Sequence, residues 1–329
     1  MNWNPTFKSL ALAVCLAAAP PASRAEITID TVLVGNPGNM DDTTGYGAVT
    51  HVYGIGKYEV TNSQYSAFLN AVAQTDTYGL YNTNMGVDDR GGITQTGTLG
   101  SFIYSTRTNM ADKPVNFVSW FDAARFSNWM MNGQGNGSTE TGAYTLSVPD
   151  TGVVAMNPGA TWYIPSENEW YKAAYYDPGT SGPPVGEYWI YPTRSDDVPT
   201  IATADAAGQI NNPGANVVNY SLGADWGGQF GNLTTVGSAG PLSASFYGTY
   251  DQGGNVFEWN ATGNSLRGGD WQDTENSLES DFFNDAFNPL DEADYLGFRI
   301  ATIPEPSSLL LMAMGGASAL VWWRRKSRA

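Results

Sequence analysis

Three stretches in the body of this chain have the pattern of a regular helix, and all three are short. Each follows a residue whose side chain caps helix N-termini: Thr61, Ser119 and Ser166. The residue three positions later completes a capping box in every case: Gln64, Asp122 and Glu169. Apolar residues then recur at helical spacing. The large aromatic residues in and beside these stretches are expected in the core: Tyr65, Trp120, Trp129 and Trp170.

Long stretches rich in Gly, Thr and Asn separate these helices. Residues 76–114, 132–160 and 178–245 lack a helical period and are predicted to be loops or insertions. Residues 51–60 alternate loosely and are predicted to form a pair of strands. The chain has 38 glycines in 329 residues but is 42% hydrophobic, which is too apolar for disorder. We therefore expect one loop-rich globular domain, without internal repeats.

Both ends are expected to lie outside this domain. Residues 1–25 combine Lys8, an apolar run of about ten residues and a small-x-small site, as in a secretory signal peptide cleaved before Glu26. A membrane anchor is the alternative, but that run is too short to span a bilayer. Residues 304–329 contain Pro304-Glu305-Pro306, then an uncharged run at 307–323, then four cations in the last six residues. This order is typical of a membrane helix with a cytoplasmic basic end.

The C-terminal segment, residues 304–329, resembles a PEP-CTERM sorting signal. The resemblance implies export in a Gram-negative bacterium, transient anchoring in the inner membrane through the C-terminal helix, and processing by an exosortase. The processed protein would then reside at the cell surface or in the extracellular matrix. Systems of this kind are associated with extracellular polysaccharide.

The charge of the body excludes several kinds of chemistry. Residues 26–303 contain nine Lys or Arg and 31 Asp or Glu, a net charge of about −22. Nucleic acid is therefore not an expected partner, whereas cations are. The one cysteine, Cys15, lies in the predicted signal peptide, and His51 is the one histidine. Thiolate sites, His-rich metal sites and a Ser-His-Asp triad are accordingly not expected.

The segment GGNVFEWN, residues 253–260, places Glu258 between two large aromatic residues and behind two glycines. From the residues alone, two interpretations stay open. Glu258 is either a calcium ligand, because Ca²⁺ prefers carboxylate, amide and carbonyl oxygens, or a buried carboxylate paired with an arginine such as Arg299.

Several segments in order resemble the formylglycine-generating enzyme, or sulfatase-modifying factor, family: YEVTNSQYSAFLNAV, PVNFVSWFDAARFSNWM, YIPSENEWYKAAYY, YDQGGNVFEWN, LRGGDWQD and LGFRIA. The resemblance covers about residues 47–301 and assigns residues 26–303 to one such domain. It implies an α+β fold, a C-type-lectin-like variant with little regular structure, stabilised by calcium.

The resemblance also implies the calcium ligands. Asn255 and Glu258 would supply side-chain oxygens, and Gly254 and Val256 would supply carbonyls. In a second site, Asn216 would supply its side chain and Val217 its carbonyl, with Asp225 a weak acidic partner. The alternative for Asn216 is a loop residue that caps a turn.

Copper chemistry is not expected. Active members of the family carry two cysteines that bind copper, and these positions read Asp273 and Leu278 here. An Asp and a Leu cannot replace two thiolates around copper(I), so formylglycine generation should be absent.

The acidic stretch from Asp270 to Asp294 is the predicted ligand surface, with Asp270, Trp271, Asp273 and Asp281 as its candidate residues. The alternative is a solvated acidic loop whose aromatic residues pack inward. We expect a non-catalytic domain that binds a polysaccharide or a protein. The competing hypotheses are an enzyme of this family with an altered, cysteine-free site, and a purely structural matrix protein.

Overall fold

The computed structural model describes Met1 and residues 26–150, 152–179 and 187–304. The predicted signal peptide and the predicted C-terminal membrane helix lie outside the described residues. Within these ranges, none of the helices is long and apolar enough to cross a membrane.

The three predicted helices are confirmed, and their capping boxes form as expected. The caps Thr61, Ser119 and Ser166 each accept a hydrogen bond from the backbone three residues later, and that residue's side chain accepts one from the cap's N–H. Four α-helices are found among the described residues: α1 (Asn62–Val72), α2 (Asn84–Val87), α3 (Trp120–Met131) and α4 (Glu167–Tyr175). Two 3₁₀ helices accompany them: η1 (Pro241–Ser243) and η2 (Glu275–Leu278).

The strands are short and form four small sheets. The largest is antiparallel, in the order β1 (Thr31–Val34), β2 (Tyr53–Gly56), β11 (Ala301–Thr302) and β5 (Trp162–Tyr163). A second sheet has β8 (Phe257–Trp259) between parallel β10 (Leu296–Gly297) and antiparallel β9 (Leu266–Arg267). The others are the hairpin β3 (Ile93–Thr96) and β4 (Ile103–Thr106) and the parallel pair β6 (Thr200–Ile201) and β7 (Val217–Val218).

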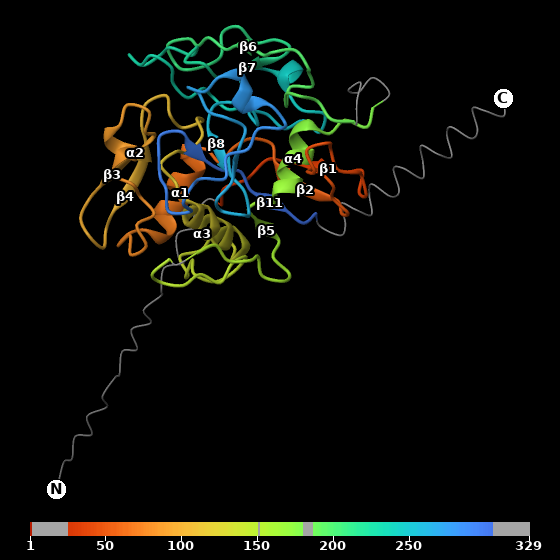
Figure 1. Ribbon diagram of the computed structural model, residues 1–329. Helices are drawn as coiled ribbons and strands as arrows, with labels where there is room; N and C mark the ends of the chain where they lie inside the picture. Colours follow the sequence, from red (N-terminus) through yellow and green to blue (C-terminus); the bar gives the residue numbers. More distant parts are fainter. Residues whose placement is uncertain (2–25, 151, 180–186, 305–329) are drawn as a thin grey trace.

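The helices and the central strands enclose an aromatic core. Tyr65 of α1 stacks on Phe126 of α3, with ring centroids 6.2 Å apart. Phe126 also meets Phe298, which precedes β11, edge to face at 5.4 Å. Both helices therefore contribute their apolar faces to one core, and the aromatic residues predicted to be buried are buried. The segments around β6 and β7 cover this core at the top of the view (Figure 1).

Two details of the predicted elements are corrected by the structure. Residues 51–60 contain one strand, β2, whose partners come from residues 31–34 and 301–302. The stretch 76–114 is not only loop, because it holds α2 and the β3–β4 hairpin. The overall prediction of a loop-rich α+β fold is confirmed.

Candidate ligand-binding site

The glycines of GGNVFEWN permit a backbone path that other residues would block. Gly254 has a φ of +72°, and a Cβ there would lie 2.1 Å from the Asn219 carbonyl oxygen. Asn255 follows at φ 63°, in the left-handed region that Asn tolerates. The chain then enters β8, where Phe257 and Trp259 are buried as expected.

Glu258 is part of a buried ion pair. Its Oε1 accepts from Arg299 Nη2 at 2.5 Å, and its Oε2 accepts from Arg299 Nε at 2.6 Å and from Trp170 Nε1 at 2.7 Å. Glu258 and Arg299 are both 0% exposed. The structure therefore shows the arginine pair that the sequence left open, and both carboxylate oxygens are already satisfied within the protein.

The other side chains proposed as calcium ligands are also occupied. Asn255 Oδ1 accepts from Thr234 N at 2.9 Å and from Asn219 Nδ2 at 3.1 Å. Asn216 Oδ1 accepts from Thr193 Oγ1 at 2.5 Å, and its amide donates to the Asp197 carbonyl at 2.9 Å. These partners agree with a loop asparagine that holds a turn. The side chains of Asn255, Glu258 and Asn216 thus do not fit a calcium ion in this arrangement.

Two further carboxyl groups, those of Glu59 and Asp251, lie near this ion pair. Both carboxylate oxygens of Glu59 are buried without a hydrogen-bond partner, and Glu59 is 1% exposed. Burial raises the pKa of Glu59, and the nearby Asp251 raises it further. Burial likewise raises the pKa of Asp251, to about 6. Two carboxylates therefore share the interior with Glu258 and the single guanidinium of Arg299. No group of three or more His, Cys, Asp or Glu among the described residues is arranged to hold a metal ion.

Two of the four predicted ligand-surface residues are buried. Trp271 is 4% exposed and lies under the Arg90 guanidinium, whose carbon is 3.9 Å from the ring centroid. Asp270 is 2% exposed and accepts from the backbone of its own turn, at Gln272 N and Asp273 N. Burial, followed by the charge of Asp273, raises the pKa of Asp270 to about 7. The structure therefore does not present Asp270 or Trp271 to a ligand.

The positions that carry copper cysteines elsewhere in the family differ in environment. Asp273 is half-buried. Leu278 is 0% exposed and packs against Tyr191, Val218 and Tyr220. The buried side chain of Leu278 therefore occupies one of the two positions that would hold copper.

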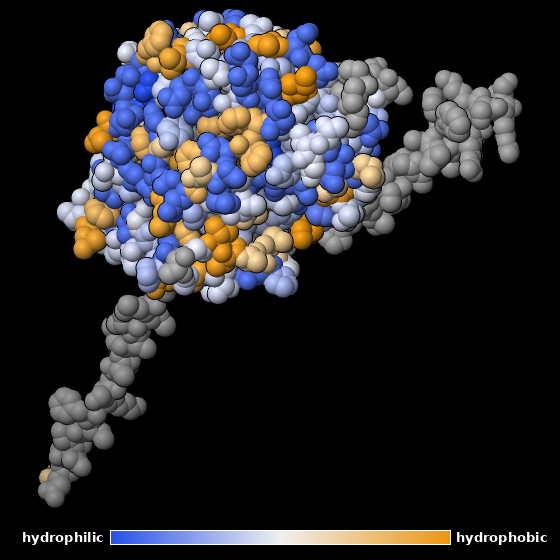
Figure 2. All heavy atoms as spheres, viewed as in Figure 1, coloured by the Kyte–Doolittle hydropathy of each residue, from blue (hydrophilic) through white to orange (hydrophobic). Residues whose placement is uncertain are grey.

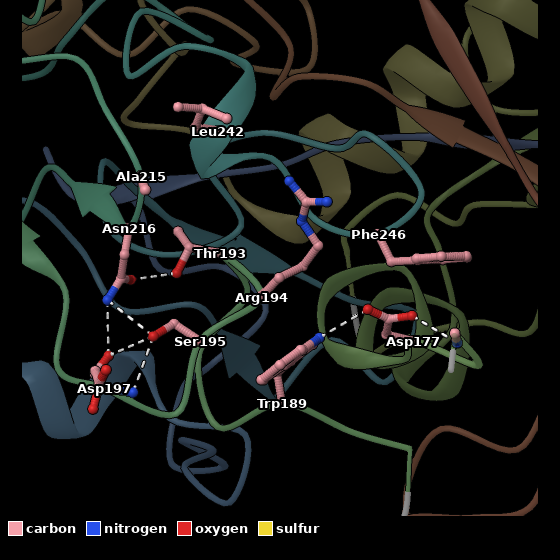
Figure 3. A pocket seen from close by; sticks show the side chains of 11 residues that line it. Asp177, Trp189, Thr193, Arg194, Ser195, Asp197, Ala215, Asn216, Leu242 and Phe246 are labelled. Atoms are coloured by element: carbon pink, nitrogen blue, oxygen red, sulfur yellow. Dashed lines mark hydrogen bonds between the residues drawn. The ribbon is translucent and has the colours of Figure 1, made fainter. Parts of the chain in front are cut away.

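A large open cleft lies on another part of the molecule, around Trp189. Its volume is about 700 Å³. The described residues that line it are Asp177, Gly179, Trp189, Thr193, Arg194, Ser195, Asp197, Ala215, Asn216, Leu242 and Phe246. Trp189 and Asp177 stand on one side and the cluster around Asn216 on the other, with Arg194 between them (Figure 3).

The polar side chains of this cleft are fixed by hydrogen bonds. Trp189 Nε1 donates to Asp177 Oδ2 at 3.1 Å, while Asp177 Oδ1 accepts from Gly179 N at 2.8 Å. Arg194 has a φ of +60° and donates from Nε to the Ala244 carbonyl at 3.0 Å. Arg194 thus lines the cleft with its backbone in the left-handed region and its side chain bonded to the Ala244 carbonyl. The site is thus built before any ligand arrives.

A second cleft adjoins the first, because Trp189 lines both. Its volume is about 310 Å³, and Asp281, one of the predicted surface residues, lines it. The other lining residues are Asp42, Thr43, Thr44, Tyr188, Ile190, Asp196, Glu279 and Ser280. Together the two clefts place six carboxylates and one arginine around a half-buried indole. Polar and apolar residues are interspersed over the face shown in Figure 2.

Short helices, small sheets and long connecting loops define a loop-rich α+β scaffold. Residues 23–303 match the model of the "Sulfatase-modifying factor enzyme 1-like domain". The chain belongs to this family, and the resemblance inferred from its motifs is confirmed. Residues 302–326 match the "PEP-CTERM protein-sorting motif". That motif supports export with membrane-associated processing by an exosortase.

Solved structures agree on the fold. The crystal structure of CarF is 23% identical, covers 84% of this chain and 99% of its own, and superposes with a TM-score of 0.51. Treponema denticola variable protein 1 (17% identity, 86% and 98% coverage, TM-score 0.46) and PvdO from Pseudomonas aeruginosa (19%, 84% and 92%, 0.39) are less similar. At 23% identity, the similarity to CarF shows the fold alone. No curated protein matches the chain.

A histidine–carboxylate pair near β5 gives the protein a pH-dependent contact. His51 Nε2 lies 2.9 Å from Glu169 Oε1, which also accepts from Tyr163 at 2.8 Å. The hydrogen bond with Glu169 raises the pKa of His51 above 6.5. Burial alone would raise the pKa of Glu169, but the hydrogen bonds from His51, Ser166 and Tyr163 together lower it below 4.5.

Replacement of His51 by glutamine is expected to lower the melting temperature most between pH 4.5 and 6.5. A raised histidine pKa contributes stability below 6.5 that is lost as pH rises through the folded-state value. A lowered glutamate pKa contributes stability above 4.5 that is lost as pH falls through its folded-state value. Thermal melts of both proteins at pH 5.5 and pH 8.5 check this; an equal difference at the two pH values contradicts it.

Proposed function

We propose that this exported domain binds an extended polysaccharide at the cleft around Trp189 and does not catalyse a reaction. The observation that carries the proposal is the pre-arranged cleft, with a half-exposed indole anchored by Asp177 and flanked by fixed polar groups. Tryptophan offers a large apolar face together with a polar N–H, and such residues dominate binding energy at sites of recognition. The open shape of the clefts suits a polymer that passes across the surface.

The charge of the two clefts selects among polymers. Six carboxylates against one arginine produce a negative potential, which opposes anionic ligands and favours neutral or amino-bearing ones. We therefore propose a neutral or amino-sugar polysaccharide. The net charge of about −22 for residues 26–303 favours the same partners.

A glycan array tests this proposal. The purified protein is expected to bind neutral or amino-bearing oligosaccharides and to ignore uronic-acid and sulfated ones. Binding confined to anionic glycans, or binding to no glycan at all, contradicts the proposal. A purely structural matrix protein would give the second of these results.

We propose in addition that a calcium ion binds the buried carboxylate of Glu59 and the half-buried carboxylate of Asp251. The support is the orphaned Glu59 carboxylate, because a buried charge needs a partner, and carboxylate oxygens are the ligands that Ca²⁺ prefers. This location differs from the side chains of Asn255 and Glu258, which are occupied. That the backbone carbonyls of Gly254 and Val256 bind calcium remains a prediction.

Chelation of calcium is expected to lower the melting temperature by roughly 5–10 °C, since a ligand at 100 times its Kd stabilises a fold by about 2.7 kcal/mol. Asp251→Asn should remove most of the chelator's effect on the melting temperature. Asp225→Asn, at the weak acidic partner of the second predicted calcium site, should leave that effect unchanged. Differential scanning calorimetry with and without chelator gives the measurement. Identical melting curves with and without chelator would show that protons, and not calcium, neutralise Glu59 and Asp251.

A further inference from the structure

An apolar pocket of about 570 Å³ opens beside the point where the folded domain ends. Its apolar walls come from Val52, Met156, Ile164, Ala261 and Ile303. Its polar part is the group of His51, Tyr163, Ser166 and Glu169. Neither cleft around Trp189 shares a residue with it, so this is a separate site.

The sorting motif begins in this pocket's wall, without a spacer. The matched motif covers residues 302–326, and Ile303 lines the pocket. Thr302 is still part of β11, between β2 and β5, and Ile303 N donates to the Thr161 carbonyl at 3.1 Å. Pro304 is itself buried. The first residues of the motif are therefore packed on the domain.

An enzyme that recognises Pro304 and the residues after it must approach this surface. Ile303, the residue before Pro304, lines the pocket, so an enzyme bound at Pro304 would lie next to the pocket. Ile303 and Met156 are 48% and 42% exposed, which gives the rim two accessible apolar contacts. The His51 side chain is 55% exposed, and its Nε2 contacts Glu169.

We propose that this pocket is the docking surface for the processing enzyme that reads the sorting motif. An apolar side chain of that enzyme fills the pocket, and a hydrogen-bonding or acidic group of it meets His51. Pocket and motif together then form the recognition site, so the domain takes part in its own processing. The proposal rests on the sorting motif and not on the polysaccharide cleft.

The test is processing of the full chain in a host that supplies the exosortase. Ala261→Arg fills the pocket, and Met156→Glu places a charge on its rim. Mass spectrometry of the C-terminus measures the processed fraction, which is expected to fall at least tenfold in both variants. Leu99→Glu and Phe230→Glu, at exposed apolar residues outside this pocket and outside both clefts, serve as matched controls and should be processed normally.

A pocket variant counts as folded when its melting temperature lies within about 2 °C of that of the parent protein. Normal processing of a folded Ala261→Arg protein overturns the proposal. Light scattering addresses a second copy of the chain as the occupant: a change in oligomeric state in this variant, with processing intact, also overturns it. Binding of phosphatidylglycerol vesicles that is lost in Ala261→Arg while processing continues would assign the pocket to lipid instead.

Discussion

Replacement of Arg299 by leucine is expected to lower the free energy of unfolding by about 3–5 kcal/mol, the usual cost of breaking a buried ion pair from one side. Glu258 would remain at 0% exposure and lose the guanidinium that binds both of its oxygens. Arg299 also donates to the carbonyls of Gly56 and Tyr250. Its loss therefore loosens β2 and the start of the GGNVFEWN segment together.

Chemical denaturation followed by tryptophan fluorescence measures the effect. Arg194→Leu removes an exposed arginine and should change the unfolding free energy by less than about 0.5 kcal/mol. The double variant Glu258→Met with Arg299→Leu should recover much of the loss, because two apolar residues leave no unpaired charge. If Arg299→Leu lowered the free energy of unfolding by less than about 1 kcal/mol, this would contradict the proposed contribution of the Glu258–Arg299 ion pair to stability.

Replacement of Trp189 by alanine is expected to weaken polysaccharide binding at least tenfold, corresponding to about 1.4 kcal/mol. Trp189 lines both clefts, so its loss removes the surface that joins them. Its indole N–H also holds Asp177 in place. Isothermal titration with an oligosaccharide identified on the array provides the affinity.

Phe230→Ala is the matched control for Trp189→Ala. Phe230 is 70% exposed and lines neither cleft, so its removal should leave the affinity unchanged. Phe246→Ala should weaken binding less than the loss of Trp189, because Phe246 lines only the first cleft. Equal affinity of the parent and Trp189→Ala would place the binding surface elsewhere.

The helices could be predicted from the sequence because their signals are local. A capping residue, its partner three positions on and a helical apolar period all lie within one short segment, as at Ser119 and Asp122. The family could be recognised for the same reason, since each of its motifs is contiguous. The hairpin β3–β4 was not predicted because its strands are only four residues long and lie in a stretch rich in Gly and Thr.

The site could not be predicted in the same way, because the cleft is assembled from distant segments. Asp177, Asn216 and Phe246 are far apart in sequence and meet only through long loops. The usable signal was the cluster of aromatic residues at 188–191, where Tyr188 and Tyr191 are buried and Trp189 is half-exposed. The prediction that Asp270 and Trp271 belong to a ligand surface was wrong, because composition alone does not show that these two residues are buried.

Hydroxyl-radical footprinting of the full chain, with and without a bound neutral polysaccharide, tests the central claim most directly. The account predicts that Trp189 and Phe246 become protected when the polymer binds, while Phe230 stays as reactive as before. Protection confined to residues outside the two clefts, or no protection at saturating polymer, would contradict it.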